Sequence, residues 1–514
     1  MKVDNILIVG GGSAGWMTAT TLLKAFPNKK ISLIESPNIS TVGVGESTIG
    51  GFKYWMNYVG IDDKHFLKNT DGSYKLSIKF TDFYKKGQSF HYPFGDPFTV
   101  GNKADLNDWW IKKAIYNDTP NSDYVDCNYP HMALVNENKF FYNRNKELPS
   151  FDFDKDTALN FDATKFALWL RDYYCLPKGV NHIKEDIVSI QQDENGIKSL
   201  NNKYTADLYI DCTGFKSLLL GQTLKEPFES YEDLLPNNSA WATRIPYKDK
   251  EKELDVYSSS TAIQNGWVWK VPLWSRIGTG YVYSDKFVSD EDALKEFQNY
   301  LGTEELNFKK LKMRVGIHKR LFVKNVCAIG LSSGFIEPLE SNGLFTIHSF
   351  LINLVRNMQR EKISQWDKDN FTFQSKILFR NFAEFVAMHY ALSIRDDTEY
   401  WRSNLNKTWE EKLTNLNPTF IAGLFTAAYH RNTFYYFSNN SGLQCITAGM
   451  NWGPTDLPSL LYHNYNNFES LKNEWQPFIE RLDKRKMEWK KIVENKPSLF
   501  KFLKDNIYNE NSTN

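Results

Sequence analysis

The chain has 514 residues, and its 62 Lys and Arg nearly cancel its 61 Asp and Glu, which leaves a net charge of +1. No excess of positive charge favours a nucleic acid or an anionic membrane surface as a partner. At about 100–200 residues per domain, the length allows about two to four domains or one large domain. Aromatic residues reach 15%, which indicates either cores rich in aromatic side chains or a cavity for a flat apolar ligand.

Several classes of protein are excluded by motifs that the sequence lacks. It contains no apolar run of about 18 residues, so no transmembrane helix is predicted, and its first residues lack a signal-peptide cleavage pattern. The five Cys form no C-x-x-C pair, and the nine His show no H-x-x-x-H or H-E-x-x-H spacing. Neither a disulfide framework nor a metal site is therefore expected. We expect a reducing, cytoplasmic location.

The hydrophobic pattern predicts strands alternating with helices at the front of the chain and mainly helices at the back. The front is predicted to hold strands at 4–10 and 31–35, helices at 13–26 and 160–175, short strands over 179–214 and 239–285, and a strand with a turn at 325–335. The back is predicted to hold helices at 344–362, 371–392, 406–415 and 467–506.

The first motif with chemical meaning is the glycine-rich turn between the first strand and the first helix. It reads Gly10-x-Gly12-x-x-Gly15, and Glu35 lies 20 residues beyond the last of these glycines, at the end of the next strand. Glycines allow a tight turn and close approach of a pyrophosphate, and the helix N-terminus favours negative charge. The motif predicts dinucleotide binding, with Ser13 and Ala14 in the turn and Glu35 as acceptor for a ribose hydroxyl. The alternative is a glycine-rich turn in an ordinary α/β sheet.

FAD and NAD share this fingerprint, and two later segments favour FAD. Residues 210–215 and 325–335 are strands that run into small residues, and Gly330 and Leu331 are placed for contact with an extended FAD. No second G-x-G-x-x-G follows a strand, so a separate NAD(P)H domain is not expected. Taken alone, these segments are equally compatible with plain strand ends.

Four further segments carry a resemblance to a known family. GWVWKVPL at 266–273, GFIEPLESNGL at 334–344, GVGEST at 43–48 and HYALSIRDDTEYW at 389–401 resemble the flavin-dependent halogenases of the tryptophan halogenase family. The resemblance implies an α/β plus α fold: a Rossmann-like (GR2-type) FAD-binding box over 1–345, with an insertion around 100–160 on the substrate side, and a mainly helical pyramid over 346–514. It adds Gly45, Glu46 and Ser47 to the expected FAD contacts.

The resemblance also implies the reaction and the partners. A separate flavin reductase would supply reduced FAD, and reduced FAD with O2 would oxidise chloride, bromide or iodide to hypohalous acid. The acid would be handed to an active-site lysine and halogenate an electron-rich arene of the indole or phenol type. No nucleic acid and no membrane are expected as partners, and assembly into a homo-oligomer is left open.

Two ionisable residues match the family's catalytic positions. Lys79 lies at the position of the active-site lysine, either as a neutral amine that forms a haloamine or as an ammonium that donates a hydrogen bond to hypohalous acid. From strand alternation alone, Lys75, Ser77 and Lys79 share one face of an exposed strand, which is an ordinary structural role. Glu340 matches the active-site glutamate, Glu337 competes with it, and both would serve equally as turn carboxylates that cap the following helix.

The resemblance places the remaining ligands as follows. The halide would bind to backbone N–H groups at Asn342 and Gly343, although the family commonly has Thr at the first of these positions, which leaves the halide preference open. Trp267 and Trp269 would lie near the flavin and keep the substrate from direct contact with its hydroperoxide, which would suppress monooxygenation. The alternative, which is compatible with this role, is that they are core aromatics. The expected substrate residues are Tyr92, Pro93, Phe94 and Trp452.

The substrate segment departs from the tryptophan-specific members of the family. Those members have His directly before Pro-Phe-Gly, whereas here Tyr92 takes that place and His91 is shifted by one. Free tryptophan and a different electron-rich arene therefore both stay open. Two other functions also stay open: a single-component FAD-dependent aromatic monooxygenase, and a non-enzymatic flavin-binding or redox-sensing protein.

Overall fold

The computed structural model describes residues 1–39, 46–98, 107–405, 441–452 and 468–509, and the chain divides into two compact units. The first unit comprises residues 1–73, 159–245 and 273–383, and the second comprises residues 74–158, 246–272 and 384–514. Each unit is therefore built from segments that are far apart in the sequence. The predicted boundary at residue 345 stays a prediction.

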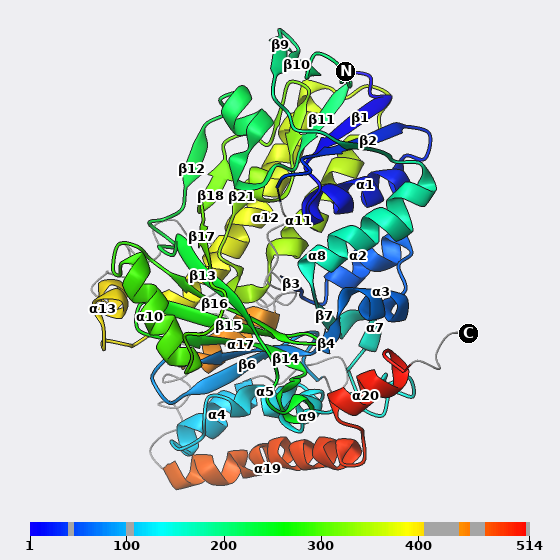
Figure 1. Cartoon of the computed structure of the whole chain (residues 1–514). Helices are drawn as coiled ribbons and strands as arrows, with labels where there is room; N and C mark the ends of the chain where they lie inside the picture. Colours follow the sequence, from blue (N-terminus) through cyan, green and yellow to red (C-terminus); the bar gives the residue numbers. More distant parts are fainter. Residues whose placement is uncertain (40–45, 99–106, 406–440, 453–467, 510–514) are drawn as a thin grey trace. The chain divides into compact units, whose positions relative to one another are not determined.

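A sheet of six strands forms the centre of the first unit, in the order β19-β20-β11-β1-β2-β8 (Figure 1). The neighbours β20, β11, β1, β2 and β8 are all parallel, with Ile8 of β1 opposite both Ile210 of β11 and Leu33 of β2. These three residues are fully buried, as expected for parallel strands covered on both faces. The strands are β1 (Asn5–Val9), β2 (Lys30–Glu35), β8 (Asn181–Lys184), β11 (Leu208–Asp211), β19 (Phe322–Val323) and β20 (Val326–Ala328).

The remaining helices and strands of the first unit lie outside this six-stranded sheet. Its helices are α1 (Ser13–Ala25), α2 (Phe52–Val59), α3 (Asp63–Thr70), α8 (Ala163–Trp169), α10 (Asp290–Leu301), α11 (Gly343–Asn357) and the first part of α12 (Gln365–Ala391). Its remaining strands are β3 (Glu46–Ser47), β7 (Ala158–Phe161), β9 (Ile190–Asp193), β10 (Gly196–Leu200), β12 (Phe228–Ser230), β13 (Ser239–Ile245), β16 (Ile277–Tyr283), β17 (Lys309–Lys312), β18 (Gly316–His318) and β21 (Gly334–Phe335).

The second unit contains four strands in the order β15-β14-β5-β6 and a set of helices. Strands β14 and β5 are parallel, and the other neighbours are antiparallel. The strands of this unit are β4 (Ser73–Lys75), β5 (Ser77–Thr81), β6 (Ser89–Pro93), β14 (Tyr257–Ala262) and β15 (Gly266–Pro272). Its helices are α4 (Asn107–Ile115), α5 (Asp123–Asn128), α6 (Met132–Asn136), α7 (Phe153–Asp156), α9 (Lys250–Glu253), α13 (Glu399–Leu405), α17 (Ser441–Gly449), α19 (Phe468–Val493) and α20 (Leu499–Asn506).

The predicted elements are confirmed in kind, with shifted ends. The helix predicted over 160–175 begins only at Ala163, because Asp162 caps it through the backbone N–H groups of Thr164 and Lys165. The single helix predicted over 467–506 is two helices, since Pro497 and the N-cap Ser498 separate α19 from α20. The helix predicted over 406–415 lies outside the described residues.

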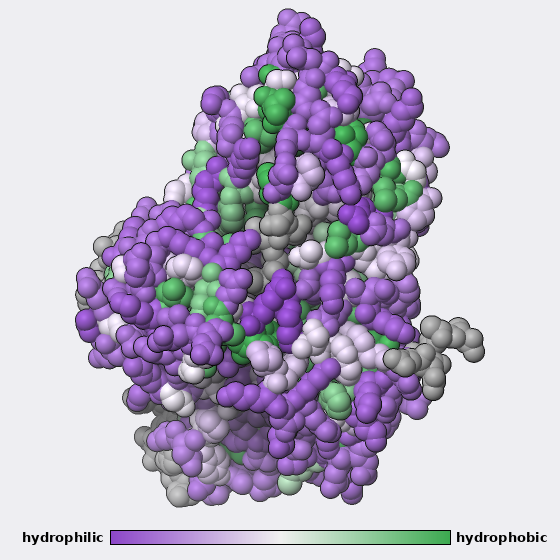
Figure 2. Space-filling view, in the orientation of Figure 1, coloured by the Kyte–Doolittle hydropathy of each residue, from purple (hydrophilic) through white to green (hydrophobic). Residues whose placement is uncertain are grey.

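The surface seen in Figure 2 is mostly hydrophilic, with hydrophobic side chains scattered between polar ones. Among the residues that the structure describes, none of the helices combines the length and the apolar character that a membrane span requires.

Candidate functional site

The glycine turn after β1 leaves open space in front of helix α1. Gly10 has a φ of +112°, and a Cβ atom there would lie 2.3 Å from the backbone oxygen of Cys212. A Cβ atom on Gly15 would lie 1.8 Å from the Gly10 oxygen, so this glycine allows close packing of helix and strand. A Cβ atom on Gly12 would meet nothing within 4 Å, and no side chain caps the helix at this residue. The turn therefore fits a phosphate group bound at the helix N-terminus.

Glu35 lies beside this turn, at the carboxyl end of β2. Its Oε1 atom lies 2.6 Å from Nε2 of His182, on the neighbouring strand β8. A Cβ atom on Gly11 would lie 1.5 Å from Oε2 of Glu35, so the carboxylate leans over the turn. His182 could not be predicted from the sequence. Its contact with Glu35 follows from the pairing of β8 with β2, and this pairing is known only when the order of strands in the sheet is known.

The turn after β20 packs against the same helix start. Gly330 has a φ of +75°, and a Cβ atom there would lie 2.7 Å from the Cβ atom of Ala14. The structure thus brings the predicted residue Gly330 to Ala14 of the first turn, and the next residue, Leu331, is exposed. Because β1, β2, β11 and β20 are parallel, their carboxyl ends meet at one edge of the sheet, where open α/β sheets bind their ligands. These features fit an extended dinucleotide.

The predicted residues Glu46 and Ser47 form the short strand β3 in the first unit, while Gly45 lies outside the described residues. Glu46 pairs with Phe161 of β7, and the Ser47 hydroxyl donates a hydrogen bond of 2.8 Å to Oδ1 of Asn160. Burial, and then the nearby charge of Asp162, raises the pKa of Glu46 to about 7. This carboxyl group is therefore protonated in part at neutral pH.

The two glutamates of the EPLE segment are both buried in the first unit. Oε2 of Glu337 accepts a hydrogen bond of 2.9 Å from the side-chain amide of Asn237, which indicates a structural role for this carboxylate. Glu340 ends a short 3₁₀ turn, and Asn342 then occupies the N-cap position of α11, which starts at Gly343. Oδ1 of Asn342 is buried without a hydrogen-bond partner among the described residues. A Cβ atom on Gly343 would meet nothing within 4 Å, so space is open at this helix N-terminus.

The strand register of the second unit sorts the predicted residues onto two faces. Ser260 of β14 lies opposite Trp269 on one side and Phe80 on the other, so these side chains share a face. Tyr92 lies opposite Ile78, which is on the same face as Phe80 because side chains alternate along a strand. Lys79 points to the other face, where His91 lies directly opposite it on β6. The sheet therefore separates Lys79 from Tyr92 and Trp269.

Trp267 and Trp269 lie side by side as the spacing of two residues predicts. Their ring centroids are 6.2 Å apart at an interplanar angle of 58°, and Trp267 is fully buried. Trp267 therefore belongs to the core of the second unit, and Trp269 lies half-buried beside it.

Lys79 lies in a polar group that the sequence did not reveal. Its Nζ atom lies 5.8 Å from the centroid of the Tyr257 ring, and the His91 ring stands perpendicular to that ring at 5.1 Å. Nδ1 of His91 lies 3.0 Å from the hydroxyl oxygen of Ser77. Burial, and then the charge of Lys79, lowers the pKa of His91 to about 3, so this imidazole is neutral. Burial raises the pKa of Asp255, in the same group, to about 6 against the opposing charge of Lys79.

Lys75, four residues earlier, occupies a different environment. Its side chain is fully buried, and its Nζ atom lies 5.0 Å from the centroid of the Phe94 ring. The Phe94 ring in turn contacts the Tyr92 ring, with centroids 5.8 Å apart. The structure therefore brings Lys75, and not Lys79, to the aromatic residues that the sequence predicts for the substrate.

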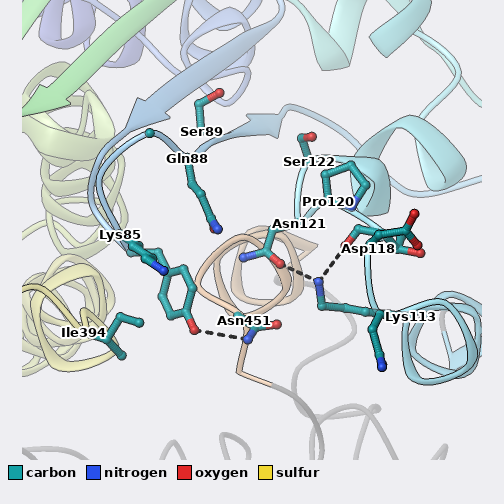
Figure 3. Close-up of a pocket in the computed structure, with 14 residues that line it drawn as sticks. Lys85, Gln88, Ser89, Lys113, Asp118, Pro120, Asn121, Ser122, Ile394 and Asn451 are labelled. Carbon is teal, nitrogen blue, oxygen red and sulfur yellow. Dashed lines mark hydrogen bonds between the residues drawn. The ribbon is translucent and has the colours of Figure 1, made fainter.

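A polar pocket of about 710 Å³ lies at the turn between β5 and β6 (Figure 3). Gln88, Lys113 and Asn121 are among the residues that line it, and none of the residues predicted for substrate, cofactor or halide does so. Asn451 contributes to the lining and donates a hydrogen bond of 3.1 Å to the Tyr84 hydroxyl. The predicted residue Trp452 follows directly, half-buried, with its backbone N–H bonded to Thr447.

One group of potential metal ligands occurs in the described part of the second unit, formed by Asp123, Cys127 and Asp483. Lys112 bridges the two carboxylates at 2.8 and 2.7 Å, and Lys486 forms an ion pair with each of them. Burial alone would raise the pKa of Asp123, but hydrogen bonds from these lysines lower it. Two cations already balance the charge, so the group is an ion-pair network between helices.

The chain and its fold are similar to those of known proteins. The family model described as tryptophan halogenase matches residues 5–464. The chain is 31% identical over 539 residues to the tryptophan 7-halogenase RebH of Lentzea aerocolonigenes, covering 98% of both proteins. The structure is similar to that of VirX1, with a TM-score of 0.88 and 36% identity over 99% of this chain and 100% of that one. It is also similar to Tar14, a tryptophan C-6 flavin-dependent halogenase, with a TM-score of 0.80 and 26% identity over 97% and 99% of the two chains.

The fold and the comparisons thus define the class of the protein. It is a mixed α/β flavoprotein with a Rossmann-like FAD-binding fold, as predicted. The chain belongs to the tryptophan halogenase family, and it is an enzyme, a flavin-dependent halogenase. The family resemblance predicted from the motifs is confirmed.

Proposed function

We propose that the protein uses reduced FAD, O2 and a halide to halogenate an electron-rich arene of the indole or phenol type. The observation that carries this proposal is the fully buried Lys75 side chain, whose amine lies against the ring of Phe94, one of the residues predicted for the substrate. An amine in such surroundings holds an electrophilic halogen or hypohalous acid without competition from bulk water.

The residues around the first helix would hold the cofactor. The open N-terminus of α1 at Gly12 suits the pyrophosphate, Glu35 suits the ribose, and the turn at Gly330 suits the remaining length of an FAD. Reduced FAD with O2 supplies the oxidising power that converts a halide to hypohalous acid. A separate reductase would supply the reduced flavin, because a second dinucleotide motif is absent from the sequence.

The halide would lie at the N-terminus of α11. The backbone N–H groups from Gly343 onward, in the open space at the N-cap Asn342, are suitable donors for an anion. Asn in place of the usual Thr changes the size and polarity of this position. Bromide and iodide are more easily oxidised than chloride, so all three are proposed as co-substrates.

The substitution step needs a halogen donor and a base. A ring carbon of the arene forms a bond to the halogen while the halogen–oxygen bond of hypohalous acid breaks. The ring proton then leaves to a carboxylate, for which Glu340 is the candidate, and its electron pair returns to the ring. The departing hydroxide takes a proton and leaves as water. The lysine amine orients the acid by a hydrogen bond, or carries the halogen as a haloamine.

A matrix of halides and substrates tests the proposal. Purified protein receives reduced FAD from an unrelated reductase, O2, and chloride, bromide or iodide, with a panel of indoles, phenols and free tryptophan. Mass spectrometry should detect halogenated arene in at least one halide series and no product without halide. A hydroxylated product that forms without halide would establish an aromatic monooxygenase instead. Reduced flavin that is oxidised without any arene product would contradict both functions.

A further inference from the structure

Two glycines of helix α17 lie against two aromatic rings of strand β6. A Cβ atom on Gly442 would lie 2.6 Å from both Cζ and Oη of Tyr92, and a Cβ atom on Gly449 would lie 2.2 Å from two ring carbons of Phe90. Cβ atoms do not approach other heavy atoms within about 3 Å, so both rings occupy space that only glycine leaves free. Figure 1 shows α17 beside β6, within the second unit.

The spacing of both pairs explains this fit. Gly442 and Gly449 are seven residues apart, or about two helical turns, so they lie on one face of α17. Phe90 and Tyr92 are two residues apart on a strand, so they share one face of β6. The helix therefore lies across that face with one glycine on each ring.

The two rings have different neighbours. The Tyr92 ring contacts Phe94 at 5.8 Å and Phe385 at 6.0 Å between centroids. Phe94 is the ring beneath the Lys75 amine. The Phe90 ring instead stacks on Phe80, at 5.2 Å. Tyr92 thus has another predicted substrate residue, Phe94, as a ring neighbour, whereas the ring neighbour of Phe90, Phe80, is not one of the predicted substrate residues.

We infer that Gly442 is a specificity-determining residue, which sets the width of the arene site by holding Tyr92 back against helix α17. This inference rests on the proposed function. It adds that the site selects its substrate by the width of the fused or substituted aromatic ring. A bulky Tyr in the place of the smaller His of the tryptophan-specific members is accommodated because the helix carries no side chain at this residue.

The test compares Gly442→Ala with its matched control Gly449→Ala. Each variant adds one methyl group to the same face of the same helix, against a ring of the same strand. For a wide substrate such as a substituted indole and a narrow one such as a phenol, kcat and KM are measured with bromide. One methyl group in an apolar pocket changes selectivity by about tenfold or more. Gly442→Ala should lower the wide-to-narrow ratio of kcat/KM by this factor, mainly through KM, and Gly449→Ala should leave the ratio unchanged.

A second substitution links the effect to Tyr92. Tyr92→His removes the atoms that Gly442→Ala would meet, so the double variant should regain the ratio of Tyr92→His alone. In the protein that keeps Gly442, Tyr92→His alone should raise the wide-to-narrow ratio of kcat/KM. This single variant keeps the inference testable if Gly442→Ala does not fold. An unchanged ratio in Gly442→Ala, or an equal change in Gly449→Ala, would overturn the inference. Absence of any halogenated product from the wild type would overturn the proposed function instead.

Discussion

Replacing Lys75 and Lys79 one at a time tests which of the two amines binds the hypohalous acid or carries the halogen. We expect Lys75→Met to abolish most halogenation and Lys79→Met to leave it nearly unchanged. Met keeps the length and apolar volume of the lysine stem and removes only the amine. Loss of a positioned proton donor or acceptor slows a reaction by about 100- to 10,000-fold, and this is the expected loss of product rate for Lys75→Met.

The environments of the two amines set the expected effects on folding. The Lys79 side chain is partly exposed and lies over Tyr257, a cation–π contact worth about 0.5–1 kcal/mol at such a site. The contact of the buried Lys75 with Phe94 is worth about 2 kcal/mol when fully desolvated. Neither loss unfolds a protein of ordinary stability, so both variants should bind FAD and allow its reduced form to be oxidised.

The assay measures two rates in the same reaction. Oxidation of reduced FAD is followed by absorbance, and halogenated arene is followed by mass spectrometry. For Lys75→Met, we expect wild-type flavin oxidation with little product, and for Lys79→Met, product within about threefold of the wild type. The opposite pattern would refute our reasoning from burial and support the assignment of Lys79 that the family resemblance implies. Loss of flavin oxidation in either variant would indicate a structural role.

Three further predictions concern the first unit. Glu46→Gln should flatten the pH dependence of the free energy of unfolding in urea. Burial raises the pKa of Glu46 from 4.5 to about 7, so the folded wild type must give up this proton as the pH rises. Between about pH 4 and pH 8, its free energy of unfolding should therefore fall by up to about 3 kcal/mol more than that of the variant. Gly12→Val should raise the Kd for FAD by about tenfold or more, measured by flavin fluorescence, with an unchanged Tm, because its side chain enters open space. Glu340→Gln should slow halogenation by about 100-fold or more with intact FAD binding, whereas Glu337→Gln, whose carboxylate is held by Asn237, should act mainly on Tm.

The sequence predicted the first strand, the glycine turn and the first helix well, because local chemistry decides these elements. The strand, the glycine turn and the helix are contiguous, and Glu35 follows at the distance that one βαβ unit requires. Gly10 and Gly15 are at positions where a Cβ atom has no room, which is a local constraint. His182 was missed because its contact with Glu35 depends on the order of strands in the sheet.

The surroundings of Lys79 and Tyr92 could not be predicted in the same way, because strand register and helix packing decide them. Alternation correctly indicates that Ser77 and Lys79 share a face, but it does not say which face carries the aromatic residues. Only the pairing of β5 with β6 and β14 puts His91 opposite Lys79 and Tyr92 on the other side. Likewise, the contact of Gly442 with Tyr92 joins residues that are 350 positions apart in the sequence, and no local sequence pattern predicts this contact.

The chemistry of the neighbouring rings supplies a separate argument for Lys75. A phenol and a neutral imidazole react readily with electrophilic halogen, whereas an unsubstituted phenyl ring reacts slowly. An oxidant held at Lys79 would meet the Tyr257 ring at 5.8 Å and the His91 ring beside it, so the enzyme would halogenate itself. An oxidant held at Lys75 meets the phenyl ring of Phe94 first. Peptide mass spectrometry after turnover without arene should therefore find Tyr257 unmodified. Halogenation of Tyr257 at the rate of flavin oxidation would instead indicate that the oxidant is held at Lys79.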